Sequence, residues 1–406
     1  MDIFDKYALV DRRHASLLEV GDDPFGVRMD EILSATKALI NGRETILAGT
    51  NNYLGLTFDA DCIEAAVEAT RSQGTGTTGS RIANGTYALH RQLEEEIAKY
   101  LERRHALVFS TGYQANLAML AGLAGAQDII LMDADSHASI YDGCMLSGAK
   151  VIRFRHNDPE DLDRRLTRLS GEGGSKLIVV EGIYSMLGDR APLAEFAEVK
   201  RGHDAYFLVD EAHSLGVMGD HGRGAAEEAG MEDDVDFVVG TFSKSLGAIG
   251  GFGASNHPKL DVLRFNARPY MYTASCSPAT VASVSMALKR MQEMPELRHR
   301  LWRNADGLYA ALTDLGYEIC SPMSPIIAIK LPDEATAVWV WNRLLQSGVY
   351  VNLALPPGTP NGACLLRCSL SAAHSEEQVQ QIGECFAAIM RDMPATAEGQ
   401  TTAASA

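Results

Sequence analysis

The chain has 406 residues, of which 46% are hydrophobic and 37 are glycine, so it can bury a large core and divide into a major and a minor domain. Its formal net charge of −17 argues against nucleic-acid binding, because a phosphate backbone is bound by clustered Lys and Arg. The amino terminus lacks the apolar stretch of a secretory signal, and no run reaches the ~18 apolar residues of a membrane span. We therefore expect a cytoplasmic protein whose seven cysteines are reduced thiols.

The main pattern along the chain is a series of short apolar runs between residues 105 and 255. Amphipathic segments separate the runs, which read HALVFS, DIILMDAD, KLIVVEGIYS, AYFLVDEAH and DFVVGTFSK. Runs of this length predict parallel strands in a doubly wound α/β sheet. We assign this sheet to a large domain at residues 46–275, and we expect residues 1–45 to pack beside the domain that follows it.

Polar residues stand at the end of each of these five runs. Open α/β sheets bind ligands at the carboxyl ends of their strands, so five polar strand ends together predict one common site. The groups in question are Ser110, Asp133 to His137, Glu181 to Ser185, Asp210 to His213, and Ser243 to Lys244.

Beyond residue 275 the pattern changes to long helical periods, followed by the strand-like segments IIAIKL, GVYVNLAL and ACLLRCSL. This predicts a smaller α+β domain at residues 276–394. The last segment, residues 395–406, is small and polar, and we expect it to be a disordered tail.

The stretch GTFSKSLGAIGGFG places Lys244 among small hydroxyl residues and glycines. A phosphate-binding P-loop needs glycine where Ser243 stands, and the glycines that follow lack the spacing of a dinucleotide fingerprint. The remaining interpretation is an amine that condenses with the aldehyde of pyridoxal phosphate.

Asp210 ends the run AYFLVD, where its carboxylate could keep a pyridine nitrogen protonated, and His213 could reach the phenolic oxygen of the same ring. Both types of residue are also common as caps and loop anchors. Thr241 and Ser243, beside Lys244, offer hydroxyl donors to a phosphate. A metal site is not expected, because the spacing of His213 and His221 fits no standard ligand set.

Two further strand ends fit the same site. In FSTGYQAN, Gly112 and Tyr113 open a helix whose free amides favour an anion, although an ordinary strand-to-helix turn has the same pattern. His137 could stack on a flat cofactor ring, or it could be a structural residue of its loop. Arg367 lies inside the apolar run ACLLRCSL, where either a substrate carboxylate or a structural ion pair would satisfy it.

Ordered motifs over nearly the whole chain resemble those of the α-oxoamine synthases, which are pyridoxal phosphate enzymes of fold type I. The motifs are NNYLGLTFD, GTGTTGSRIANGT, FSTGYQAN, DADSHASIYDG, EGIYSMLGDRAPL, VDEAHSLGVMGDHGRG, GTFSKSLGAIGGF and LLRCSL. The resemblance implies an α/β fold with a mostly parallel, doubly wound sheet in the large domain and a smaller α+β carboxyl-terminal domain. Through VIRFRHND, DFVVGTFSKS and YVNLALPPGTPNG, the chain is most similar to the soluble bacterial serine palmitoyltransferase branch of this family.

The resemblance also implies a role for each matching residue. Lys244 would bind the cofactor aldehyde, Asp210 the pyridinium nitrogen and His213 the phenolic oxygen, while His137 would stack on the ring. The residues implied near the phosphate are Gly112, Tyr113, Thr241 and Ser243. Asn52 and Arg367 are implied at the substrate carboxylate. In a homodimer, Thr273 would reach the partner chain's phosphate. The sequence departs from the family after YMYTAS, because it reads SCSPAT where a proline pair is common.

The implied reaction is the decarboxylative condensation of L-serine with a long-chain acyl-CoA such as palmitoyl-CoA. It gives 3-ketodihydrosphingosine, CoA and CO2, the first step of sphingolipid synthesis. Condensation of glycine or alanine with a shorter acyl-CoA, as in aminolevulinate, 2-amino-3-ketobutyrate or 8-amino-7-oxononanoate synthesis, stays open. An aminotransferase and a non-catalytic subunit are further alternatives, and weak peripheral contact with a membrane through the amino-terminal segment has little support.

Overall fold

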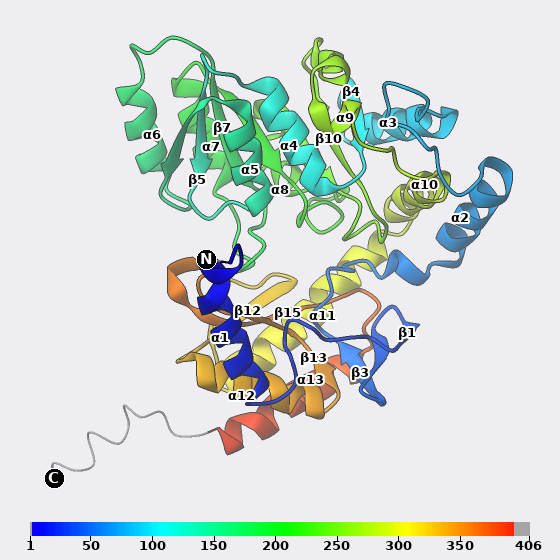
Figure 1. Ribbon diagram of the computed structural model, residues 1–406, viewed down its shortest axis with the longest axis vertical. Helices are drawn as coiled ribbons and strands as arrows, with labels where there is room; N and C mark the ends of the chain where they lie inside the picture. The colour runs from blue at the N-terminus through cyan, green and yellow to red at the C-terminus, as the bar shows by residue number, and fades with distance from the viewer. Residues whose placement is uncertain (1, 394–406) are drawn as a thin grey trace. The chain divides into compact units, whose positions relative to one another are not determined.

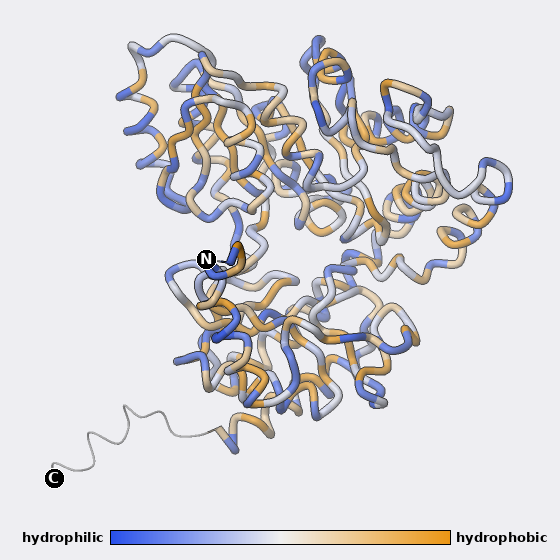
Figure 2. The backbone as a smooth tube through the Cα atoms, viewed as in Figure 1, coloured by the Kyte–Doolittle hydropathy of each residue, from blue (hydrophilic) through white to orange (hydrophobic). Residues whose placement is uncertain are grey.

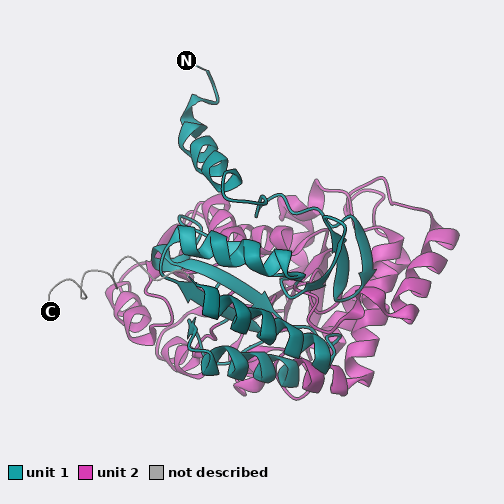
Figure 3. Cartoon of the chain, turned by 90° about the horizontal axis from the view of Figure 1, so that it is seen from below, with its two compact units in different colours: residues 1–50, 186–188, 302–406 teal, residues 51–185, 189–301 magenta. Residues whose placement is uncertain are grey.

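The structure is a computed structural model that describes residues 2–393 (Figure 1), so the expected tail at 395–406 lies outside the described residues. The chain divides into two compact units (Figure 3). The large unit comprises Asn51–Ser185 and Asp189–Leu301. The small unit comprises Met1–Thr50, Met186–Gly188 and Trp302–Ala406.

A seven-stranded sheet forms the centre of the large unit, in the order β4-β10-β9-β8-β7-β5-β6. Strands β6, β5, β7, β8 and β9 are parallel, and β10 is antiparallel to both of its neighbours. The bounds are β4 His105–Phe109, β5 Ile129–Asp133, β6 Lys150–Phe154, β7 Lys176–Glu181, β8 Tyr206–Asp210, β9 Phe237–Thr241 and β10 Gly251–Ser255. The prediction of a mostly parallel α/β sheet is confirmed.

The central strands are buried almost along their whole length, which explains why they read as continuous apolar runs. Figure 2 shows hydrophobic residues concentrated along these strands. The helices of the large unit are α2 Ala60–Gln73, α3 Ala88–Tyr100, α4 Gly112–Leu123, α5 Ala138–Ser147, α6 Pro159–Arg168, α7 Leu193–Gly202, α8 Ala225–Glu228, α9 Arg268–Met271 and α10 Pro278–Glu293. The large unit also contains the short 3-10 helices η2 Leu56–Phe58, η3 Glu232–Asp234 and η4 Leu260–Phe265.

Lys244 lies in the connection between β9 and β10, residues 242–250. The ends of this connection are tied together, because Phe242 N donates to Gly250 O at 2.9 Å and Ala248 N donates to Phe242 O at 2.9 Å. The hydroxyl of Thr241 also donates to Gly250 O at 3.0 Å. The lysine is therefore held on a closed turn between two paired strands.

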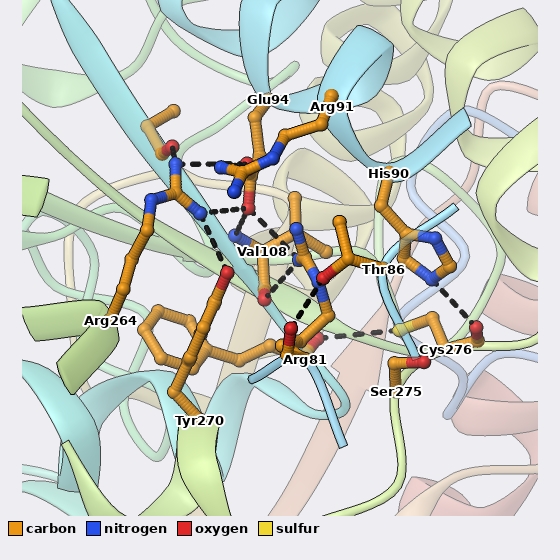
Figure 4. A network of polar contacts seen from close by, with 12 residues as sticks. Arg81, Thr86, His90, Arg91, Glu94, Val108, Arg264, Tyr270, Ser275 and Cys276 are labelled. Atoms are coloured by element: carbon orange, nitrogen blue, oxygen red, sulfur yellow. Dashed lines mark hydrogen bonds and ion pairs between the residues drawn. The ribbon is translucent and has the colours of Figure 1, made fainter. Parts of the chain in front are cut away.

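A buried ionic network joins α3 to β4 (Figure 4). The carboxylate of Glu94 lies 2.9 Å from both Arg81 Nη1 and Arg264 Nη2, and it accepts a hydrogen bond from Val108 N at 3.1 Å. Arg264 also donates to the Tyr270 hydroxyl at 2.7 Å. Since removal of one partner would leave a buried charge uncompensated, the network fixes the loop before α3 and the segment η4 against β4.

The small unit contains two four-stranded sheets, in the orders β1-β2-β3-β13 and β11-β12-β15-β14. Their bounds are β1 Glu31–Ser34, β2 Lys37–Ile40, β3 Arg43–Leu47, β11 Glu318–Ile319, β12 Ile326–Leu331, β13 Val349–Tyr350, β14 Asn352–Ala354 and β15 Cys364–Ser369. The helical segments are η1 Asp5–Tyr7, α1 Ala8–Leu18, α12 Glu334–Gln346, η5 Pro360–Gly362 and α13 Glu376–Asp392. Within residues 2–393, no helix combines the length and the apolar composition needed to cross a membrane.

The observed division differs from the expected domain bounds at two places. Helix α10 belongs to the large unit, because it packs against α2 and α3, so the boundary falls within α11 (Pro295–Asp314) and not at residue 275. The small unit begins with residues 1–50, because β3 pairs in parallel with β13. Helical periodicity alone does not tell which layer a helix packs against.

Candidate active site

A cavity of about 320 Å³ lies at the carboxyl ends of β5, β7, β8 and β9 in the large unit. It brings together eight residues that the sequence predicts for the site: Gly112, Tyr113, His137, Asp210, His213, Thr241, Ser243 and Lys244. Larger cavities of about 440 Å³ between α3 and α10, and about 630 Å³ between α11 and α13, contain none of the predicted residues. The parallel strand order thus gathers the strand ends as expected.

Three other predicted residues do not line this cavity. The hydroxyl of Thr273 accepts a hydrogen bond from Gln114 Nε2 at 3.3 Å, in the loop after α9. Asn52 Nδ2 donates to the Thr57 hydroxyl at 2.8 Å within the large unit. Arg367 lies in the middle of β15 in the small unit, where it is buried and its backbone is in register with Ala328.

Asp210 is buried at the end of β8, and both of its carboxylate oxygens accept hydrogen bonds. Asn116 Nδ2 donates to Oδ2 at 2.7 Å, and Ala212 N donates to Oδ1 at 2.9 Å. The charged carboxylate is therefore fixed in place, as a partner for a protonated ring nitrogen must be.

Asn116 also connects Asp210 to His137. Its side-chain amide lies 2.9 Å from Ser139 Oγ, and that hydroxyl lies 2.7 Å from His137 Nδ1. Sequence analysis did not single out Asn116 or Ser139. The available signal was an amide side chain within the otherwise apolar segment ANLAML, residues 115–120 of α4.

Burial lowers the pKa of His137. The negative charge of Asp210 opposes this decrease, and the positive charge of Lys244 adds to it. The ring is therefore neutral at physiological pH and suited to lie against a flat aromatic cofactor. Glu181 also lines the cavity and accepts a hydrogen bond from His137 N. Burial, followed by the charge of Asp210, raises the pKa of Glu181 well above its usual range.

His213 is oriented by a buried tyrosine that sequence analysis did not single out. The Tyr53 hydroxyl lies 2.7 Å from His213 Nδ1, and the Tyr53 side chain is fully buried. When the tyrosine donates this hydrogen bond, the imidazole proton is on Nε2 and can be donated to another acceptor.

The start of α4 forms one end of the cavity. Thr111 caps the helix, and a Cβ atom on Gly112 would lie 2.7 Å from the Thr241 side chain, so only glycine fits at this approach. The Thr241 and Ser243 hydroxyls lie 2.8 Å apart. Helix amides and hydroxyls at this end suit a phosphate, while Asp210, Lys244 and the neutral His137 suit a pyridine aldehyde, so these residues fit pyridoxal phosphate.

The described residues contain no group of three His, Cys, Asp or Glu side chains that could hold a metal ion. His221, which stands near His213 in the sequence, pairs with Glu227 at 2.5 Å.

Comparisons with known proteins show which sequences and structures this chain resembles. The family model for class I and II aminotransferases matches residues 43–385. A serine palmitoyltransferase of Caulobacter vibrioides is 57% identical over 389 residues, covering 96% of each chain. A serine palmitoyltransferase structure from Sphingomonas wittichii superimposes with a TM-score of 0.94 at 52% identity, covering 97% of this chain and all of that one.

A solved structure of a serine palmitoyltransferase that carries pyridoxal phosphate as an internal aldimine has a TM-score of 0.95 at 46% identity, covering 97% of this chain and 99% of that one. An 8-amino-7-oxononanoate synthase of Lysinibacillus sphaericus is more distant, at 36% identity over 91% of this chain and 95% of the relative.

Proposed function

Because the chain belongs to the class I and II aminotransferase family and its cofactor is pyridoxal phosphate, we propose that it catalyses the serine palmitoyltransferase reaction. The observation that carries this proposal is the 57% identity to a serine palmitoyltransferase over nearly the full length of both chains. The relative that makes 8-amino-7-oxononanoate is 36% identical, which favours serine and a long-chain acyl-CoA over alanine and a shorter one.

The proposed reaction joins L-serine to palmitoyl-CoA. A carbon–carbon bond forms between serine Cα and the thioester carbonyl, CoA leaves as the thiol, and the serine carboxylate leaves as CO2. When bound, pyridoxal phosphate supplies an aldehyde that condenses with amines and a ring that accepts the electron pair left at Cα.

The protein's own residues hold and move the other groups. Lys244 Nζ would bind the aldehyde of the resting enzyme, and when free it would take the proton from serine Cα and return a proton after loss of CO2. Asp210, which accepts a hydrogen bond from Asn116, would keep the ring nitrogen protonated. His137 would hold the ring face and His213 the phenolic oxygen, while the start of α4 with Thr241 and Ser243 would hold the phosphate, since all of these residues line the cavity.

Arg367 and Asn52 are proposed to hold the serine carboxylate, since a buried guanidinium is a bidentate partner for such a group. Replacing Arg367 with lysine keeps the charge but removes the planar fork, so we expect the KM for serine to rise roughly 10- to 100-fold, about 1.4 to 2.8 kcal/mol. Steady-state kinetics would measure this. The matched control is Arg343→Lys, because Arg343 pairs with Asp392 at the surface. If Arg367→Lys left the KM for serine unchanged, Arg367 would have a structural role and would not bind the carboxylate.

We further propose that the protein is a homodimer with the site near the interface. Large apolar side chains are exposed on α5 and η4, and just after α9, and all three elements pack against α4 beside the cavity. These residues, which we call the apolar face, are Met145, Leu146, Val262, Phe265 and Tyr272. Phe265 and Tyr272 are 70% and 72% exposed, and large apolar side chains gathered on one exposed surface mark an interaction site.

Replacing Phe265 with glutamate should dissociate the dimer, because an unpaired carboxylate would be buried at the interface. We expect the dimer dissociation constant to rise about 100-fold or more. Light scattering coupled to size exclusion would measure the mass. Phe58→Glu, also an exposed phenylalanine but on η2, should leave the dimer intact. A dimer that survives Phe265→Glu unchanged would remove the apolar face from the interface.

The direct test of the proposed function is the mass of the product. Purified protein with pyridoxal phosphate would receive serine, glycine and alanine together with acyl-CoAs from acetyl to stearoyl. We expect a long-chain ketone that carries the carbons of serine, and hence an entry step into sphingolipids in the cytoplasm. A short product from glycine or alanine would overturn the substrate, and a keto acid formed without consumption of thioester would indicate an aminotransferase. Sedimentation with vesicles would test the weak membrane contact.

A further inference from the structure

His156 lies two residues beyond β6, between two carboxylates. Its Nδ1 is 2.8 Å from Asp133 Oδ1, and its Nε2 is 2.7 Å from Asp189 Oδ2. Because ionised carboxylates only accept hydrogen bonds, both ring nitrogens donate and the ring is an imidazolium cation. Burial lowers the pKa of His156, but the hydrogen bonds and charges of Asp133 and Asp189 outweigh burial and raise the pKa to about 10.

One of these carboxylates belongs to a segment that we call the strap, residues 182–192. The strap leaves the large unit after Ser185 and returns to it at Asp189, and its tip, Met186–Gly188, is part of the small unit. Within the small unit, the hydroxyls of Ser321 and Ser324 donate to Leu187 O at 2.7 Å and Gly188 O at 2.8 Å.

The limbs of the strap are held in the large unit. Tyr184 N donates to Asp189 O at 2.9 Å, which closes the strap behind its tip. The Asp189 carboxylate also accepts a hydrogen bond from Asn157 Nδ2 at 2.8 Å. The Tyr184 ring lies edge-on to His156, with 4.5 Å between ring centroids. His156 is thus enclosed by the strap on one side and by β5 on the other.

Asp133 and the residues at the base of the strap lie close to the cavity. Asp133 ends β5 and accepts a hydrogen bond from Asp135 N at 2.8 Å, in the loop that carries His137. Glu181 immediately precedes the strap and lines the cavity, and Gly182 N donates to Asp210 O at 2.9 Å. A shift of the strap would therefore move cavity walls on β5, β7 and β8.

We propose that His156 is a positioning residue for the reaction: its ring holds the strap and the loop that carries His137 at a fixed separation, and so sets the cavity walls that receive the amino-acid substrate. This role rests on the proposed function, because it requires that the cavity receive pyridoxal phosphate and serine. A neutral side chain at this position would leave Asp133 and Asp189 facing each other without the cation between them.

The test compares His156→Gln with the wild-type holoenzyme by titrating serine and following the visible absorption of bound pyridoxal phosphate. We expect the dissociation constant for serine to rise about 10- to 100-fold, since small misplacements of positioning groups have effects of this size, while kcat changes less. His203→Gln is the matched control, because His203 Nε2 pairs with one carboxylate, Asp163, at 2.8 Å, outside the cavity.

Two further variants keep the test decisive. Asp189→Asn removes only the negative charge of the partner in the strap and should weaken serine binding in the same direction. The double variant His156→Gln/Asp189→Asn should bind serine more tightly than His156→Gln alone. In it, the carboxylate of Asp133 no longer faces a second uncompensated carboxylate at position 189. If His156→Gln does not fold, Asp189→Asn decides alone.

A pH measurement gives a readout that does not depend on activity. His156 has a raised pKa, so its contribution to stability is complete below about pH 6.5 and is lost as the pH rises through about 10. The unfolding temperature of the wild type should fall over this window more steeply than that of His156→Gln.

The outcomes separate this role from the proposed function. A wild-type holoenzyme that shows no spectral response to serine would contradict the proposed substrate. A wild type that responds, with folded His156→Gln or Asp189→Asn binding serine equally well, would overturn the positioning role of His156.

Discussion

Replacing Lys244 with alanine is expected to abolish turnover and to remove the visible absorption that arises when pyridoxal phosphate is bound through a lysine. Lys244 is the lysine among the residues that line the cavity, and no other side chain there carries an amine that could bond the aldehyde. If Lys244 has both proposed roles, its loss would remove the covalent attachment of the cofactor and the base that takes the Cα proton, and neither effect would be partial.

Absorption spectra of the purified variant, and product formation by mass spectrometry, would measure these effects. Lys150→Ala is a suitable control, since Lys150 is an exposed lysine of the same unit that pairs with Glu172. Turnover by Lys244→Ala above the level of a protein-free control would show that another amine serves as the base and would overturn the assignment.

The second large effect is expected for Asp210→Asn. Asparagine keeps the shape and some hydrogen bonds but cannot stabilise a protonated ring nitrogen by charge. Loss of one partner of a buried charge pair costs about 3 to 5 kcal/mol, so kcat/KM should fall roughly 100- to 5,000-fold while the cofactor stays bound.

Asn116→Ala is the informative companion variant. It removes the hydrogen bond to Asp210 Oδ2 but leaves the carboxylate, so its loss should be smaller than that of Asp210→Asn. Steady-state kinetics of both variants would test this order. If Asp210→Asn kept wild-type kcat/KM, the carboxylate would not be the partner of the ring nitrogen.

Much of the large unit could be predicted from the sequence because its signals are local. Each buried parallel strand is one apolar run, and the residue that ends the run, such as Asp210, lies at the edge of the sheet where ligands bind. Gly112 could be placed for the same reason, since a glycine between a strand and a helix marks a close approach. In the structure this approach is to Thr241.

The supporting contacts could not be predicted, because they join residues far apart in the chain. Asn116 and Asp210 are 94 positions apart, and Tyr53 and His213 are 160 apart. The apolar segments around Asn116 and Asp210 indicate burial, but they do not tell which side chain each of them contacts. Nothing in a single sequence indicates which buried amide or hydroxyl faces which carboxylate.

The division into two units could not be predicted either, because it also depends on contacts between distant residues. Helix α10 has the periodicity of an amphipathic helix, and this pattern fits packing on either unit equally well. The crossing of the strap into the small unit at Met186–Gly188 depends on hydrogen bonds to Ser321 and Ser324, which lie more than a hundred residues away. Tertiary packing decides both features.

The closed turn between β9 and β10 has a consequence for how the lysine can act twice in one cycle. Both ends of the turn are paired, and Gly247 N donates to Lys244 O at 3.0 Å, so the backbone that carries the amine has little freedom to move away. If Lys244 has the proposed role, an amine released from the cofactor would move by its side chain and not by its backbone. The amine would then stay at a high effective concentration beside the substrate, where it could receive a proton and later bind the cofactor again without a diffusional search.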